Sequence, residues 1–254
     1  MTHRLKKEKN YSYIEAGEGT PIIVLHGLMG GLSNFDLVTE YFSAKGYKVV
    51  IPELPIYTKS LLKTNVKSFA KYLHDFIEFK GYNEVILLGN SLGGHIGLYH
   101  TKLYPEKVKA LIITGSSGLY ESAMGGGYTK RGDYEVIKKK AQDVFYDPAV
   151  ATKDIVDEVY ATVNDRNKLI KTLAIAKSAI RHNMAKDLPK MTTPTCIIWG
   201  KNDNVTPPNV AEEFDQLLPD SELFWIDKCG HAAMMEHPEE FNKVLDAWLQ
   251  KRGL

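Results

Sequence analysis

The segment 85–97 constrains the fold more than any other part of the chain. It begins with an apolar run at 85–88, which suits a strand buried on both faces of a sheet. It ends in a helical pattern, and between the two lies Gly-x-Ser-x-Gly at 89–93. A chain that turns from strand to helix so quickly strains the residue at the bend, and the flanking glycines remove side chains that would clash there. The pattern therefore predicts that the hydroxyl of Ser91 stands at the carboxyl edge of a sheet, beside a helix N-terminus.

Apolar runs alternate with helical patterns over most of the 254 residues. Strands are expected at 11–16, 21–25, 47–51, 85–88, 108–114, 195–200 and 222–226. Helices are expected at 37–44, 66–80, 92–103, 207–218 and 238–249. The alternation predicts an α/β fold with a mostly parallel sheet and right-handed connections.

The alternation stops in the middle of the chain. A loose, glycine-rich stretch that includes 125–127 is followed by helical patterns from 134 to about 188, without a strand of any length. We predict a core formed by 1–116 and 189–254, with a helical cap (117–188) inserted between two strands of the sheet. The alternative is that these helices simply extend the core.

Charge and composition exclude several classes of protein. The net charge of +1 gives no basic footprint for nucleic acid or an acidic membrane. No apolar run reaches 18 residues, so no membrane span is expected, and the first residues do not resemble a signal peptide. Cys196 and Cys229 do not make a disulfide framework, which favours a reducing, cytoplasmic location. The oligomeric state, monomer or dimer, stays open.

Three residues with complementary chemistry each follow the end of an expected strand. A serine hydroxyl needs a base to take its proton, and the base needs a carboxylate to hold its tautomer. Ser91, Asp203 and His231 occur in the order expected when a Gly-x-Ser-x-Gly turn carries the nucleophile. Because the carboxyl ends of parallel strands share one edge, the three side chains are expected to meet there. Asp227 competes with Asp203 for the acid role, since it also ends a strand.

The glycine-rich loop after the strand at 21–25 supplies candidates for binding an oxyanion. The backbone N–H groups of Leu28 and Leu92 are the expected donors. His26 is expected to be structural, with its ring hydrogen-bonded within the loop. Met29, Phe35 and Met234 are expected to contact a small-molecule substrate in a largely apolar pocket.

The sequence predicts no cofactor and no metal. His231, Glu236 and His237 cluster, but their spacing matches no zinc motif. His95 and His100, behind Ser91, are expected at the surface. The glycines at 125–127 are not followed by Lys and Ser or Thr, so no phosphate-binding loop is indicated.

With these motifs the chain resembles the α/β-hydrolase superfamily with a helical cap. The resemblance rests on His26-Gly27, the turn at 89–93, the segment 199–203, and 229–231 with 236–238. It implies Ser91 as nucleophile, Asp203 as acid and His231 as base, with Leu28 and Leu92 as oxyanion donors. A serine at the turn distinguishes the chain from the dehalogenase and epoxide-hydrolase branches, which carry Asp there.

Within the superfamily the chain resembles carboxylesterases and looks closest to the meta-cleavage-product hydrolases, which cleave carbon–carbon bonds. The segments 89–94, 228–231, 236–237 and 240–242 are similar to theirs. The latter tend to carry tryptophans after the catalytic histidine, where this chain has Ala232 and Met235. They also bind the dienoate of the substrate with a cap arginine, whose place falls near Val159, so that Arg166 or Arg181 would have to substitute. We therefore expect a serine hydrolase of small or medium carboxylic esters, with hydrolysis of a vinylogous diketone second. A non-catalytic ligand receptor on the same fold is the alternative from another class.

Overall fold

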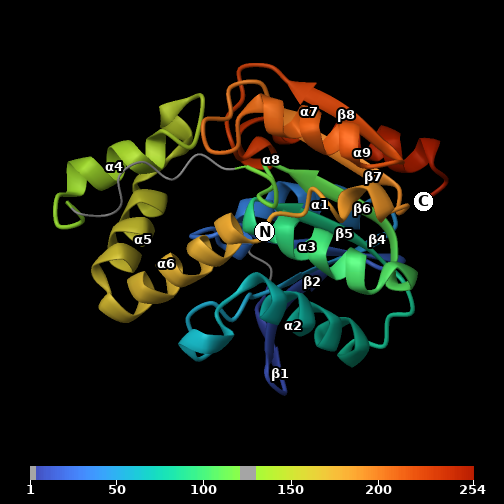
Figure 1. Ribbon diagram of the computed structural model, residues 1–254, viewed down its shortest axis with the longest axis horizontal. Coiled ribbons are helices and arrows are strands. Elements are labelled where there is room, and N and C mark those ends of the chain that lie inside the picture. The colour runs from blue at the N-terminus through green and yellow to red at the C-terminus, as the bar shows by residue number, and fades with distance from the viewer. Residues whose placement is uncertain (1–3, 121–129) are drawn as a thin grey trace.

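The computed structural model describes residues 4–120 and 130–254, and these residues form one sheet of eight strands flanked by helices (Figure 1). The strands are β1 (Lys6–Glu8), β2 (Tyr11–Ala16), β3 (Thr20–Leu25), β4 (Tyr47–Pro52), β5 (Val85–Asn90), β6 (Val108–Thr114), β7 (Thr195–Gly200) and β8 (Ser221–Ile226). Their order in the sheet is β1-β2-β4-β3-β5-β6-β7-β8. Pairs that include β2 are antiparallel and all others are parallel, which confirms the predicted α/β fold.

The helices follow the predicted alternation closely. They are α1 (Asp36–Ser43), α2 (Val66–Phe79), α3 (Leu92–Leu103), α4 (Tyr134–Gln142), α5 (Lys153–Asn164), α6 (Arg166–Arg181), α7 (Pro208–Leu217), α8 (Ala233–Glu236) and α9 (Pro238–Lys251). Short 3-10 turns are η1 (Leu32–Phe35), η2 (Leu61–Lys63), η3 (Pro105–Lys107), η4 (Pro148–Val150) and η5 (Leu188–Lys190). The start of α2 is capped by Asn65, whose side-chain oxygen accepts the N–H of Ser68 at 2.9 Å.

The central strands are apolar throughout because helices cover both faces of the sheet. Along β5, Val85 and Leu87 pack on the side of α2, α3 and α7. Ile86 and Leu88 point to the opposite side, against α1 and α9. All four side chains are fully buried, which explains an uninterrupted apolar run rather than an alternating one.

Two elements escape sequence reasoning because they carry no hydrophobic pattern. β1 consists of two lysines and a glutamate, all exposed, and it pairs with β2 at the edge of the sheet. α8 has only four residues, too few to show a period.

The helices α4, α5 and α6 lie between β6 and β7 in the chain and extend to the left of the sheet in Figure 1. The segments that lead into and out of this region lie side by side. The N–H of Met184 donates to the carbonyl of Gly118 at 2.8 Å and connects them. The division into a core and a cap at 117–188 stays a prediction, and the glycines at 125–127 lie outside the described residues.

The expectation that His95 and His100 lie at the surface was wrong. Both have an exposed fraction of 0%, because α3 is covered on nearly all sides. His95 Nε2 lies 2.9 Å from His182 Nδ1, and His95 Nδ1 lies 3.3 Å from the Ser117 hydroxyl. Burial lowers the pKa of each of the two α3 histidines to about 3, so both are neutral near pH 7.

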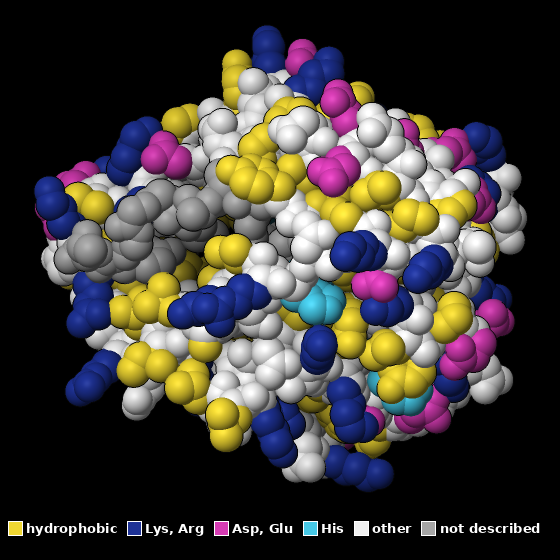
Figure 2. Space-filling model, viewed as in Figure 1, with side chains coloured by type: hydrophobic (Ala, Val, Ile, Leu, Met, Phe, Trp, Pro, Cys, Tyr) yellow, Lys and Arg dark blue, Asp and Glu magenta, His cyan; other side chains and the backbone are white. Residues whose placement is uncertain are grey.

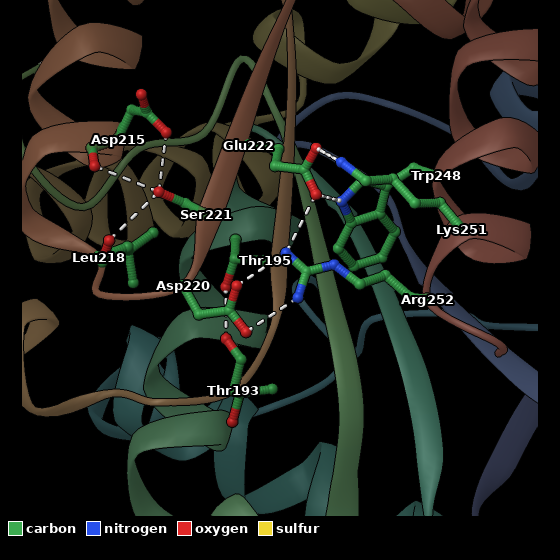
Figure 3. Close-up of polar contacts among 10 residues, drawn as sticks. All are labelled: Thr193, Thr195, Asp215, Leu218, Asp220, Ser221, Glu222, Trp248, Lys251 and Arg252. Carbon is green, nitrogen blue, oxygen red and sulfur yellow. Dashed lines mark hydrogen bonds and ion pairs between the residues drawn. The ribbon is translucent and has the colours of Figure 1, made fainter.

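The edge strand β8 is held in place by the C-terminal end of α9 (Figure 3). Arg252 donates two hydrogen bonds to Asp220, at 2.7 and 3.1 Å, and a third to Glu222 at 3.0 Å. Glu222 also accepts from Lys251 at 2.6 Å and from the indole of Trp248 at 3.1 Å. This network positions the strand that leads directly into the loop of His231.

Neither cysteine forms a disulfide, and both are buried. Burial raises the pKa of both thiols, so neither is an activated nucleophile. None of the described helices is long and apolar enough to span a membrane.

Candidate active site

Ser91 sits at a strained turn between β5 and α3. Its backbone has φ = 53° and ψ = −119°, a conformation that costs of order 1–3 kcal/mol for a residue with a side chain. Three backbone hydrogen bonds hold it there. The Ser91 N–H donates to Thr114 O at 3.1 Å, and Ser91 O accepts the N–H groups of His95 (3.2 Å) and Ser117 (3.3 Å).

The two glycines of the turn are required by close approach of the backbone. A Cβ at Gly89 would lie 2.4 Å from the nitrogen of Gly94, and a Cβ at Gly93 would lie 2.1 Å from the carbonyl oxygen of Leu25. Real Cβ atoms do not approach backbone atoms so closely. The steric reason inferred from the sequence motif is therefore present in the structure.

Asp203 and His231 meet at the carboxyl edge of the sheet, after β7 and β8. The Nδ1–H of His231 donates to Asp203 Oδ2 at 2.9 Å, and the carboxylate side chain is completely buried. The N–H groups of Val205 and Thr206 donate to Oδ1 at 2.8 and 2.9 Å, and the Thr206 hydroxyl donates to Oδ2 at 2.9 Å. Donors thus surround the carboxylate and aim it at the imidazole, which places the lone pair of His231 on Nε2.

The loop of His231 lies against the nucleophile turn. Asn90, the residue before Ser91, donates from Nδ2 to the carbonyl of His231 at 3.1 Å. Nε2 of His231 is buried and has no hydrogen-bond partner among the described residues. A buried imidazole nitrogen without a partner is a base available for a proton.

Ser91 and His231 line the same cavity, with a volume of about 370 Å³. The described residues that line it are 27–31, 34, 90, 91, 140, 141, 143–145, 155, 158, 159, 204, 205, 231, 232 and 235. They come from the loops at the sheet edge on one side and from α4, α5 and the segment between them on the other. The cavity therefore lies between the edge of the sheet and the inserted helices.

The alternative acid, Asp227, is not part of this arrangement. Its side chain is 71% exposed and pairs with Lys201 at 3.6 Å. His26 is structural, as expected: its Nε2 accepts the N–H of Leu54 at 3.2 Å and its Nδ1–H donates to Gly27 O at 2.9 Å. Burial lowers the pKa of His26, which keeps it neutral in this role.

The loop that carries Leu28 folds as a tight turn beside the nucleophile. The N–H of Gly30 donates to Gly27 O at 3.1 Å, and Met29 takes a positive φ of 59°. In the described part of the chain, the Leu28 N–H makes no backbone hydrogen bond. Leu92 begins α3, where an N–H has no acceptor within the helix. The role of these two N–H groups in binding an oxyanion stays a prediction.

The predicted substrate contacts divide into one that reaches the cavity and two that do not. Met29 lines it, whereas Phe35 and Met234 are 0% and 1% exposed and pack in the core with α1 and α9. Met235, next to Met234, lines the cavity instead. The sequence identified the apolar segments but not which neighbour turns inward.

The charged side chains among the described lining residues are Lys140, Asp143 and Glu158. None of them was predicted as a site residue, because the inserted helices carry no motif, and the lysine run 138–140 was interpreted as a solvated face. Arg166 and Arg181, the arginines considered for binding a dienoate, are exposed on α6 and do not line the cavity. Within the described residues, no group of three or more His, Cys, Asp or Glu side chains could hold a metal ion.

Comparisons with known proteins agree with this architecture. The family model described as serine aminopeptidase, S33 (Hydrolase_4) matches residues 20–238. A 2-hydroxy-6-oxo-6-(2'-aminophenyl)hexa-2,4-dienoic acid hydrolase of Metapseudomonas resinovorans is 29% identical, over 95% of this chain and 88% of that protein. A 2-hydroxy-6-oxononadienedioate/2-hydroxy-6-oxononatrienedioate hydrolase of a Pseudomonas species is 28% identical, over 91% of this chain and 88% of that protein.

Among solved structures, an α/β hydrolase enzyme from the metagenome of sediments of the Mar Chica lagoon, Morocco, is similar to this chain. It is 64% identical, with a TM-score of 0.83, over 99% of this chain and 100% of that one. The sheet, the strained serine turn and the family match agree, and the chain belongs to the Hydrolase_4 family of α/β hydrolases.

Proposed function

We propose that this α/β hydrolase cleaves carboxylic esters of small or medium size through a covalent acyl-enzyme. Ser91 is the nucleophile, His231 the general base and acid, and Asp203 the residue that orients the imidazole. The observation that carries the proposal is the 2.9 Å hydrogen bond between Asp203 and His231, which leaves Nε2 as the unpaired nitrogen beside the serine turn.

In the proposed mechanism, His231 Nε2 takes the proton of the Ser91 hydroxyl as Oγ attacks the ester carbonyl. The N–H groups of Leu28 and Leu92 stabilise the oxyanion, and the imidazolium then donates its proton to the leaving alcohol. In the second half of the reaction, water attacks the acyl-enzyme and gives its proton to His231. The carboxylic acid product leaves as His231 returns a proton to Ser91. Asp203 stabilises the imidazolium in both halves, while its other oxygen stays bound to backbone N–H groups.

The charges of the cavity support a neutral ester as substrate. Lys140 is the cation among the described lining residues, and it already takes part in another interaction. Asp143 and Glu158 add two carboxylates, which would repel an anionic substrate. The segment 121–129 contains no Lys or Arg in the sequence. We therefore expect the cavity to bind a neutral substrate better than an anionic substrate that must pair with a cation.

Hydrolysis of a carbon–carbon bond in a vinylogous diketone is the second candidate. The names of the relatives at 28% and 29% identity favour it, because both are hydrolases of 2-hydroxy-6-oxo dienoic or related acids. The same serine, histidine and aspartate would serve this reaction, so the two candidates differ in what the cavity binds. In such a reaction Lys140 is the residue placed to meet a carboxylate.

A panel of p-nitrophenyl esters of increasing acyl length tests the first candidate. We expect a burst of p-nitrophenol, loss of the burst in Ser91→Ala, and labelling of Ser91 by a fluorophosphonate. Asp227→Asn is the matched control and should keep activity.

The decay of the ultraviolet absorbance of a ring-fission product tests the second candidate, with Lys140→Gln as the informative variant. Turnover of ring-fission products without turnover of esters would reject the first candidate in favour of the second. Ligand-induced thermal stabilisation without turnover of either substrate class would instead indicate a non-catalytic receptor. A cytoplasmic location stays a prediction.

A further inference from the structure

One face of α6 combines aliphatic and cationic side chains in contact with solvent. Ile170, Leu173 and Ile180 are 42%, 48% and 52% exposed, which is unusual for large aliphatic residues. Residues three and four positions apart share a face of a helix, so the spacing places cations between them. The residues that share this face are Arg166, Ile170, Leu173, Lys177, Ile180 and Arg181.

The segment before α2 lies beside α6 and has the same character. The N–H of Val66 donates to the Ser178 hydroxyl at 3.2 Å, and Lys171 donates to the carbonyl of Tyr57 at 2.6 Å. Within this segment, Leu61 is 50% exposed and Leu62 is 92% exposed. Five of the ten large hydrophobic side chains that stand exposed in the described residues thus belong to these two neighbouring segments.

Both segments contain basic side chains and no acidic ones. Residues 59–67 and 166–181 together contain eight Lys or Arg and no Asp or Glu, although the whole chain has a net charge of only +1. In the described part of the chain, none of these eight cations forms an ion pair with a carboxylate. Figure 2 shows hydrophobic and Lys or Arg side chains next to one another at lower left, where Figure 1 places α6 and η2. We call residues 59–67 and 166–181 the basic apolar face.

We propose that the basic apolar face docks on the surface of an anionic lipid bilayer. Cations at such a surface are attracted to anionic headgroups, and aliphatic side chains between them enter the boundary between headgroups and acyl chains. Leu62, which is almost fully exposed at a 3-10 turn, is the side chain best placed to insert. The net charge of the chain gave no indication of this face, because acidic residues elsewhere in the chain offset its cations.

The aliphatic residues favour a bilayer over a nucleic acid as the occupant. A polyanion in water would use the lysines and arginines and gain little from Leu173 or Ile180. A bilayer uses both kinds of side chain, and it also accommodates the projecting Leu62. The proposal does not depend on the reaction that the cavity catalyses.

Vesicle co-sedimentation of the full chain tests the proposal. We expect binding to phosphatidylcholine vesicles that contain about one third phosphatidylglycerol, little binding to phosphatidylcholine alone, and release as salt is raised. Lys177→Gln with Arg181→Gln removes two cations and should lower the partition coefficient about 25-fold, at about fivefold for each. Leu173→Ser with Ile180→Ser should lower it about tenfold and leave the salt dependence in place.

A matched pair of exposed residues on the opposite side of the sheet is the control. Leu37 is 52% exposed, and its carbonyl accepts from Asn242, next to the exposed Lys243 on α9. Leu37→Ser with Lys243→Gln should leave vesicle binding unchanged. Equal binding to neutral and anionic vesicles, or equal loss in this control, would overturn the proposal. So would tight binding of a polyuridine that competes with vesicles and is unaffected by the Leu173 and Ile180 changes, because the occupant would then be a polyanion.

Discussion

Replacing the buried His100 by leucine should make the protein more resistant to acid. His100 is completely buried, and neither ring nitrogen has a hydrogen-bond partner among the described residues. Desolvation, then the charges of His74 and Lys107, lower its pKa from 6.5 to about 3. His100 must therefore stay neutral while the protein is folded.

The sign and size of the effect follow from the difference between the two states. Below pH 6.5 the imidazole takes a proton when the chain unfolds but not while it is folded, so the free energy of unfolding falls as pH falls. With a folded pKa of about 3, this one group costs about 2 kcal/mol at pH 5 relative to pH 7, and about 3 kcal/mol at pH 4. The loss stops below the folded pKa. His95, also near 3, contributes a similar loss that remains in the variant.

Urea unfolding at pH 7, 6 and 5, followed by the fluorescence of the buried Trp199 and Trp248, measures the effect. We expect His100→Leu to lose about 2 kcal/mol less than the wild-type protein between pH 7 and 5. At pH 7 its stability should be equal or higher, because two unpartnered polar atoms are removed. Thr101→Val, a buried neighbour that does not titrate, should shift stability equally at every pH. An unchanged pH dependence in His100→Leu would refute the argument.

Three further predictions test the active-site geometry. Gly93→Ala should unfold or aggregate the protein, since its Cβ would lie 2.1 Å from Leu25 O, whereas Gly132→Ala has open space and should be neutral; thermal melts compare them. Asp203→Asn should reduce kcat/KM on the best ester about 10⁴-fold at a similar Tm, and an activity within twofold of wild type would contradict its role. Asp227→Asn, whose carboxylate faces solvent, should retain wild-type rates in the same assay.

Much of the fold could be predicted because its determinants are local. The apolar run of β5 predicts a strand covered on both faces. The glycines at 89 and 93 indicate a tight turn, at which a larger side chain in either position would clash with the backbone. The alternation of strands and helices then predicts that β5, β7 and β8 run parallel to one another in one sheet. Since these strands end at one edge, the sequence predicts that Ser91, Asp203 and His231 lie together.

Features that depend on neighbours distant in the sequence could not be predicted from it. Asp203 rather than Asp227 faces the imidazole, because the loop after β7 is folded onto the loop after β8. Met234 turns into the core and Met235 into the cavity, although the two are adjacent in the sequence.

From the sequence, seven of the eight strands, the strained turn and the candidate residues Ser91, Asp203 and His231 could be predicted, because each is encoded within a few adjacent residues. Only the packing of distant segments determined that the histidines of α3 are buried and that two segments with eight cations lie beside each other, together with exposed aliphatic side chains. Burial and local charge are sums over neighbours in space, and a chain with a net charge of +1 reveals neither.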